Sequence, residues 1–196
     1  MKTFQIIPIA ALAFFTVSCG GNNENKEEKE EENIYEMTDK ETGITSLTSF
    51  TDSASIDVLG KNYNYTIQFQ ANDTLPHFTT PQGADYLDNE AILTISDDTT
   101  VIMKKVFTKG SFKSYLPEKL KTNSGLASFA YNALRRELKE NDAFYFIASI
   151  GNLDDQEEIP YCLEIRITPD GGMTIQKLSD SDTGPLHEGM SIEPKD

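Results

Sequence analysis

The sequence has no tryptophan, only two cysteines and two histidines, and 17 basic residues against 32 acidic ones. Two cysteines exclude a scaffold of several disulfide bonds, and two histidines nearly exclude a zinc site built from His and Cys. The net charge of −15 disfavours general binding to nucleic acid, because the phosphates would be repelled. We therefore expect no nucleic-acid partner. The 196 residues suffice for one domain of ordinary size with tails.

The sequence also lacks an apolar run long enough to cross a bilayer. Residues 4–17 are almost wholly apolar, but these fourteen residues fall short of the roughly 20 that a spanning helix needs. Their length suits a signal peptide. They lead into Ser18-Cys19-Gly20, where small residues before a cysteine resemble the lipobox of bacterial lipoproteins. The resemblance implies that residues 1–18 are a signal peptide and that Cys19 carries the lipid; an ordinary secretory peptide is the alternative.

The segment behind Cys19 has few apolar residues and many acidic ones. Residues 20–41 hold nine acids and three lysines, so they cannot bury enough surface to fold by themselves. We expect residues 19–43 to be a flexible acidic tether. The Gly-Gly-Asn-Asn start and the cluster Lys26-Glu27-Glu28 look like those of Bacteroides-type lipoproteins. That resemblance implies attachment to the outer membrane through the lipid, on the cell surface or on the periplasmic face.

The globular part shows the pattern of strands more than that of helices. Alternating polar and apolar residues predict three hairpins, with the strands 54–59 and 62–70, 91–96 and 99–107, and 161–168 and 173–178. Residues 143–150 are densely apolar, which predicts a central strand covered on both faces. Residues 44–178 are thus expected to form one domain, followed by a loose acidic tail over 179–196.

One segment between these strands has helical spacing. Asn123 or Ser124 can cap a helix. The apolar residues that then recur at the spacing of one helical face are Leu126, Phe129, Ala130, Ala133, Leu134 and Leu138. The expected fold class is α+β, with an antiparallel sheet of about seven strands in hairpins and one helix packed on it. A β-sandwich with one helix at its end is the alternative.

The order of these segments resembles a family of small Bacteroides-type lipoproteins that is known only as a domain of unknown function. The resemblance is carried by residues 91–122, with the segments Val106-Phe107-Thr108-Lys109 and Phe112-Lys113-Ser114-Tyr115-Leu116. It implies no activity.

Residues for catalysis or metal binding are sparse. His77 falls in a proline-containing connection and His187 in the tail, away from any rigid element that could hold a site. Cys162 has no intrachain partner if Cys19 is lipidated, and we expect it to be a small buried residue. An acidic loop could hold calcium or could simply be solvated; it contains Asn152, Asp154, Asp155, Glu157 and Glu158. We expect a protein that is not an enzyme, with no catalytic residue, no metal and no cofactor.

Three short triplets resemble the signal for O-glycosylation of exported proteins in Bacteroides-type bacteria. They are Asp52-Ser53-Ala54, Asp73-Thr74-Leu75 and Asp98-Thr99-Thr100. The resemblance implies Ser53, Thr74 and Thr99 as acceptors.

Positive charge is concentrated in residues 104–139, where nine basic residues face two acidic ones, a local charge of +7. Such asymmetry can mark a binding face or a merely solvated surface. The candidates for contact with an anion or partner are Lys104, Lys105, Lys109, Lys113, Arg135, Arg136 and Lys139.

We therefore expect a lipid-anchored cell-envelope protein with a non-catalytic binding domain for a protein or glycan. Its oligomeric state stays open. One alternative is a carrier or chaperone for a small apolar or lipid ligand, with a pocket lined by Tyr63, Tyr65, Phe129, Phe144 and Phe146. A weaker alternative is a hydrolase that uses paired carboxylates.

Overall fold

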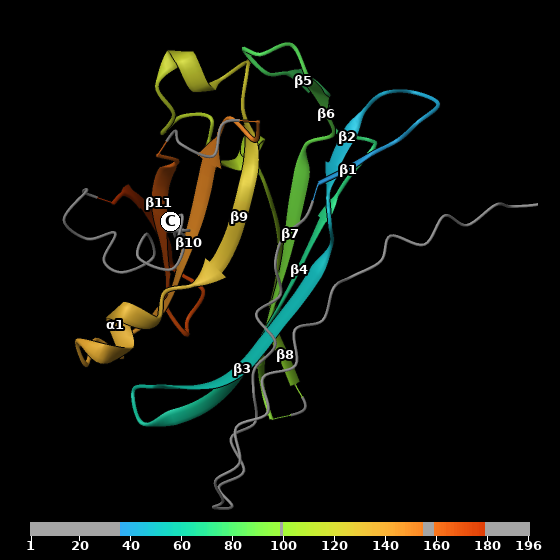
Figure 1. Cartoon of the computed structure of the whole chain (residues 1–196). Helices are drawn as coiled ribbons and strands as arrows, with labels where there is room; N and C mark the ends of the chain where they lie inside the picture. The colour runs from blue at the N-terminus through green and yellow to red at the C-terminus, as the bar shows by residue number, and fades with distance from the viewer. Residues whose placement is uncertain (1–35, 99, 155–158, 179–196) are drawn as a thin grey trace, which may run out of the picture. The chain divides into compact units, whose positions relative to one another are not determined.

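The first half of the fold is an antiparallel sheet of long strands, which we call the large sheet. The computed structural model describes residues 36–98, 100–154 and 159–178 (Figure 1). The strand order in the large sheet is β3-β4-β7-β8, with β3 (Phe50–Val58), β4 (Lys61–Ala71), β7 (Asn89–Asp97) and β8 (Thr100–Thr108). Two of the predicted hairpins are confirmed, because β3 pairs with β4 and β7 with β8, both antiparallel.

The second half forms another antiparallel sheet, which we call the second sheet. Its order is β12-β11-β10-β9, with β9 (Gly125–Tyr131), β10 (Phe144–Gly151), β11 (Tyr161–Ile167) and β12 (Met173–Lys177). The third hairpin is confirmed by the pairing of β11 with β12. β10 lies between β9 and β11, and nearly all its residues are buried, as the dense apolar run predicts.

Short elements complete the domain at one end of the large sheet. A small sheet has the order β1-β2-β6-β5, with β1 (Glu36–Thr38), β2 (Thr45–Leu47), β5 (Phe78–Thr79) and β6 (Asp85–Tyr86). β1 falls within residues 19–43, the range expected to be a tether, and its residues are exposed. Two 3₁₀ turns, η1 (Lys109–Phe112) and η2 (Glu118–Leu120), follow β8. All these elements belong to one unit, residues 32–196.

Aromatic rings fill the space between the large sheet and the second sheet. Ring centroids of Tyr63 and Phe144 are 5.1 Å apart, and those of Phe107 and Phe129 are 4.9 Å apart, each pair joining the two sheets. Such stacked and edge-to-face pairs add to the stabilisation from burial alone. Alternation along β4 and β11 places one side chain in two in this shared core.

The expected α+β class is wrong. The structure is mostly β, with 54 % of the described residues in strands, and these residues hold twelve strands in three sheets. The single α-helix of the described part, α1 (Ala133–Glu137), has five residues, and none of them is buried. It is therefore not a helix packed on a sheet. Within the described ranges, no helix is long and apolar enough to cross a bilayer.

A β-bulge accounts for the wrong helix prediction. Along β9, Ser128 pairs with Ser149 but Leu126 pairs with Ile150, so Ala127 is left without a cross-strand partner. The extra residue shifts the alternation by one position. Leu126 and Phe129 consequently both face the core although they are three residues apart, a spacing that also suits a helix.

Candidate functional site

β8 is an edge strand of the large sheet, and it presents apolar side chains to solvent. It is last in the order β3-β4-β7-β8, so one side of its backbone has no neighbour within that sheet. Val101 is 57 % exposed, Ile102 43 % and Val106 47 %. An edge strand with exposed β-branched residues is a template for pairing with another strand. We call residues 100–108 with this exposed surface the β8 edge.

Lysines and a bulge accompany these apolar residues. Lys104 is exposed and pairs in register with Thr94, on the same side of the sheet as Val106. Between Ile95 and Ser96 the register shifts, so Ile102 has no cross-strand partner on β7. The β8 edge therefore combines exposed apolar groups with positive charge, and its backbone is regular from Met103 to Thr108.

Two further lysines of the basic stretch, residues 104–139, contact the rest of the protein. The Lys105 Nζ lies 5.6 Å from the Phe107 ring centroid. The Lys109 Nζ donates a hydrogen bond to the carbonyl of Ser124 and lies 5.3 Å from the Phe78 ring centroid. Burial lowers the pKa of Lys109, and the negative charge of Asp88 opposes this effect. Lys109 is thus half-buried and held by its contacts at one end of the domain, whereas Lys113, after η1, is exposed.

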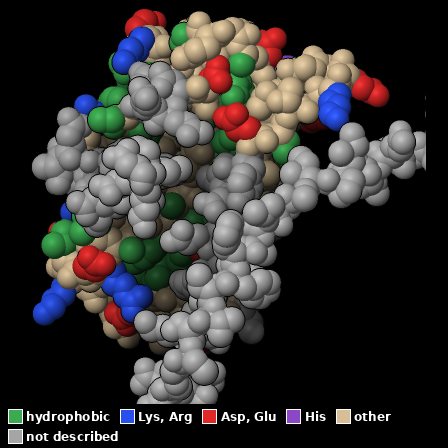
Figure 2. Space-filling view, viewed as in Figure 1, with side chains coloured by type: hydrophobic (Ala, Val, Ile, Leu, Met, Phe, Trp, Pro, Cys, Tyr) green, Lys and Arg blue, Asp and Glu red, His purple; other side chains and the backbone are tan. Residues whose placement is uncertain are grey.

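The basic stretch is divided between two ends of the domain. Lys109 lies beside Ser124, just before β9 begins, whereas α1 begins two residues after β9 ends. The seven residues of β9 span about 20 Å. Arg136 and Lys139 are exposed at the α1 end, where Figure 2 shows basic side chains beside hydrophobic ones. The candidate residues from Lys104 to Lys139 therefore do not form one face.

Arg135 is held by internal partners rather than presented to solvent. Its Nε and Nη2 donate to the two carboxylate oxygens of Glu164, at 2.7 and 2.8 Å. Its Nη1 donates to Glu140 at 2.9 Å, and its guanidinium lies 5.5 Å from the Tyr145 ring centroid. The hydrogen bonds that Arg135 donates to Glu164 raise the pKa of Arg135. We leave Arg135 out of the surface offered to a partner.

A buried polar cluster that the sequence analysis missed lies near Lys109. The Asp88 carboxylate accepts hydrogen bonds from the backbone N–H groups of Asn89 and Leu126, both at 2.9 Å. Burial raises the pKa of Asp88, and those two hydrogen bonds and Lys109 oppose the rise. The Asn89 Oδ1 has no hydrogen-bond partner among the described residues. The only sequence signal for this cluster is an Asp-Asn pair at the start of a strand.

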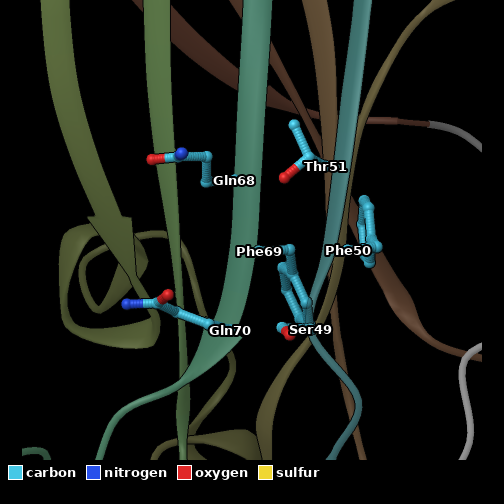
Figure 3. A pocket seen from close by; sticks show the side chains of 6 residues that line it. All are labelled: Ser49, Phe50, Thr51, Gln68, Phe69 and Gln70. Atoms are coloured by element: carbon cyan, nitrogen blue, oxygen red, sulfur yellow. The ribbon is translucent and has the colours of Figure 1, made fainter.

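A hollow of about 340 Å³ lies between β3 and β4 (Figure 3). It is lined by Ser49, Phe50, Thr51, Gln68, Phe69 and Gln70. Gln68 and Gln70 extend from one side of β4 and Phe69 from the other, so the amides and the ring do not converge (Figure 3). Phe50 stacks on Phe69 with ring centroids 5.1 Å apart. This arrangement does not favour a small-ligand site.

The aromatic residues proposed to line a carrier's pocket pack on one another instead. Tyr65 and Phe146 have ring centroids 5.8 Å apart, and Phe129 and Phe146 5.7 Å apart. Rings in such contact fill a core. The packing gives no support to a carrier of apolar ligands.

The remaining candidates occupy scattered positions. Ser53 is exposed on β3, and Thr74 is exposed in a turn where its hydroxyl donates to the Asn72 Oδ1 at 2.6 Å. His77 is exposed. Cys19, Thr99 and His187 lie outside the described residues, as do Asp155, Glu157 and Glu158 of the acidic loop.

Two residues of the acidic loop and Cys162 are within the described part. The amide of Asn152 donates to Gln82, and Asp154 accepts from Thr80. The described residues contain no group of three or more His, Cys, Asp or Glu side chains that could hold a metal ion. Cys162 is buried on the face opposite Leu163, as predicted, and burial raises the pKa of its thiol.

Comparison with known proteins gives a family and no activity. No curated protein matches the chain. The family described as "Domain of unknown function (DUF4738)" has a model that matches residues 29–175. Because this match covers well over half of the sequence, the chain belongs to that family.

Proposed function

We propose that the protein is a lipid-anchored, non-catalytic binding protein of the cell envelope that pairs with an extended acidic segment of a partner protein along the β8 edge. The observation that carries this proposal is the exposure of Val101, Ile102 and Val106 on a basic edge strand. Strand addition of this kind takes its affinity from backbone hydrogen bonds and its specificity from alternate side chains.

The charge of the β8 edge selects the partner's chemistry. Lys104 is exposed and Lys105 is half-buried on the opposite face of the same strand, and most of the other exposed residues of β8 are apolar. Lys104, Val101 and Val106 share one face of the sheet, so a partner strand that carries both acidic and apolar residues on that face would place a carboxylate near Lys104 and apolar groups against the two valines. Complementary charge also accelerates association and rejects basic competitors.

The same charge disfavours a second copy of this chain as the partner. Two antiparallel β8 strands related by a two-fold axis at their midpoint would place Lys104 opposite Lys104. Like charges directly opposite each other destabilise a sheet. Lysine on an edge strand is a known means of preventing self-pairing, and it leaves pairing with an acidic strand favourable.

The lipid anchor supplies the location in this proposal. The lipobox-like Ser18-Cys19-Gly20 supports lipidation at Cys19, and the acidic residues behind it support an outer membrane of the Bacteroides type. Replacing Cys19→Ala should abolish incorporation of a labelled fatty acid and release the protein from membranes. Ser18→Ala, which keeps a small residue before the cysteine, is the control and should still be labelled. Unchanged membrane retention of Cys19→Ala would contradict the anchor.

Site-specific photo-crosslinking in intact cells tests the β8 edge. A benzoylphenylalanine at Val106 should give adducts of a larger protein, and the partner peptide in the adduct should be rich in Asp and Glu. The matched control is the same probe at Thr51, which is exposed on β3 at the opposite edge of the same sheet. We expect at least a five-fold higher adduct yield at Val106.

Charge reversal separates the proposed pairing from unspecific contact. Lys104→Glu together with Lys105→Glu should remove most of the Val106 adduct, because the two introduced glutamates would repel the acidic strand. Equal yields at Val106 and Thr51, or an adduct unaffected by charge reversal, would refute the proposal. An adduct of two copies of this chain would replace it with self-association.

A further inference from the structure

The turn between β3 and β4 contains a leucine that neither local conformation nor burial explains. Leu59 has a φ of 55° and Gly60 a φ of 78°, so both central residues of this two-residue turn are left-handed. Such turns favour Asn-Gly or Asp-Gly, because few other side chains tolerate a positive φ. Leu59 is also 69 % exposed. A residue that is unfavourable both in its backbone conformation and in its exposure to water is a candidate for function.

A second exposed leucine lies on the neighbouring loop. Leu138, which follows α1, is 57 % exposed. The backbone N–H of Leu59 donates to the carbonyl of Asn141 at 2.8 Å, and the Asn141 amide donates to Asp57 at 3.3 Å. These bonds join the β3–β4 turn to the loop after α1. Figure 1 shows the turn and α1 at the same end of the domain.

We propose that this end, which we call the leucine tip, inserts Leu59 and Leu138 into a lipid bilayer at the boundary between the headgroups and the acyl chains. The leucine tip consists of the turn at Leu59 and Gly60 and the loop from Leu138 to Asn141. Exposed apolar side chains on two turns that are joined by hydrogen bonds can enter the membrane interface without any change of fold. Their transfer from water into the bilayer is favourable. This surface goes beyond the proposed function, because it is distinct from the lipid on Cys19 and from the β8 edge.

The charges at the leucine tip suit an interface without requiring an anionic lipid. Arg136 and Lys139 are exposed and form no ion pair within the described part of the chain. Long basic side chains of this kind can reach the headgroups while apolar groups go deeper. Glu137 and Asp57 carry negative charge at the same end. We therefore assign the binding of the leucine tip to the bilayer mainly to the two leucines, and we expect this binding to depend little on the content of anionic lipid.

The length of the N-terminal segment permits the contact, on the proposed condition that Cys19 is anchored. The described chain begins at β1, which pairs with β2 near the start of β3, whereas the leucine tip lies at the end of β3. The nine residues of β3 span about 30 Å. The sixteen residues between Cys19 and Glu36 can reach about 55 Å when extended. The tip can thus face the same membrane that holds the lipid.

Fluorescence of a single introduced tryptophan tests the proposal, because the native chain contains none. The full chain carrying Cys19→Ala, which removes the lipid, is given Leu138→Trp. With phosphatidylcholine vesicles we expect a blue shift of its emission and quenching by brominated acyl chains. Met37→Trp is the matched control, since Met37 is 56 % exposed on β1, and it should show neither effect.

A second substitution separates insertion from unspecific adsorption. Leu59→Asn suits the positive φ of the turn, so the variant should fold at least as well as the parent. In the Leu138→Trp chain it should weaken vesicle partitioning about five-fold or more, because one of two inserted leucines is lost. Adding phosphatidylglycerol should change partitioning by less than a factor of two to three.

Three results would overturn the proposal. They are the absence of a shift and of quenching at Leu138→Trp, equal effects at Met37→Trp, and a blue shift that grows with protein concentration in the absence of vesicles. The last would assign the tip to contact between two copies of the chain. None of these results bears on Cys19 or on Val106, so failure here leaves the proposed function intact.

Discussion

Glu164 has a side chain that is 1 % exposed, yet it lies among donors that suit a charged carboxylate. Its two oxygens accept hydrogen bonds from the Asn132 amide, from Arg135 twice and from the Gln176 amide, at 2.7 to 3.0 Å. A buried charge is tolerated when its partners satisfy it, and removing one partner leaves the other charge uncompensated. Glu164 thereby fastens the residues around α1 to the outer face of the second sheet.

Replacing Glu164→Gln tests this role. The carboxamide carries no charge and offers one acceptor oxygen where the carboxylate offers two, so Arg135 would lose its bidentate partner and keep only the exposed Glu140 as a counter-ion. We expect the free energy of unfolding to fall by about 3 kcal/mol, measured by urea denaturation. A loss below about 1 kcal/mol would contradict the assignment.

A second carboxylate that pairs with Arg135 provides the control. Glu140 also pairs with Arg135, but its side chain is 42 % exposed. Solvent screens such a pair, so Glu140→Gln should cost less than about 1 kcal/mol. The contrast between the two variants isolates the effect of burial, because both remove one carboxylate from one guanidinium.

At the scale of elements, hairpins were predictable and β9 was not. The alternation Tyr63, Tyr65, Ile67, Phe69 specifies a half-buried strand, and its pairing partners follow in the sequence across short turns. β9 pairs with β10 instead, across α1, and its bulge at Ala127 breaks the alternation. Local spacing cannot reveal a bulge, because the register depends on the partner strand. The sequence therefore predicted a helix where the structure has a strand.

The candidate site was predictable only in part, for a related reason. The excess of basic residues over 104–139 predicts a candidate binding surface, but whether a lysine is presented to solvent depends on its tertiary partners. Lys104 is exposed, whereas Lys109 is held by Ser124 and Arg135 by Glu164. The run Val101-Ile102-Met103 did carry a signal, because three consecutive apolar residues cannot all face one side of a strand. Only the strand order shows that this run lies at an edge.

At the scale of the whole molecule, Asp88 links the two large layers of the domain. It lies next to the start of β7 in the large sheet, and its carboxylate accepts the N–H of Leu126 in β9 of the second sheet. Asp88 is 5 % exposed, and the positive charge of Lys109, which donates a hydrogen bond to the Ser124 carbonyl, acts on its carboxylate. The protonation of Asp88 is therefore coupled to the stability of the folded domain, in which the two sheets are packed together.

This coupling predicts a pH dependence whose sign is opposite to that of an ordinary ion-paired aspartate. Burial raises the pKa of Asp88 in the folded state above its unfolded value. Between the two pKa values the folded chain binds more protons than the unfolded chain, so the contribution of Asp88 to stability falls as pH rises through that window.

Urea denaturation of the wild type and of Asp88→Asn from pH 3.5 to 7 measures this contribution as a difference. We expect the stability of the wild type relative to Asp88→Asn to decrease with rising pH and then to level off. A relative stability that increases with pH would mean that Lys109 and the two N–H groups outweigh burial, because the folded-state pKa would then lie below the unfolded value.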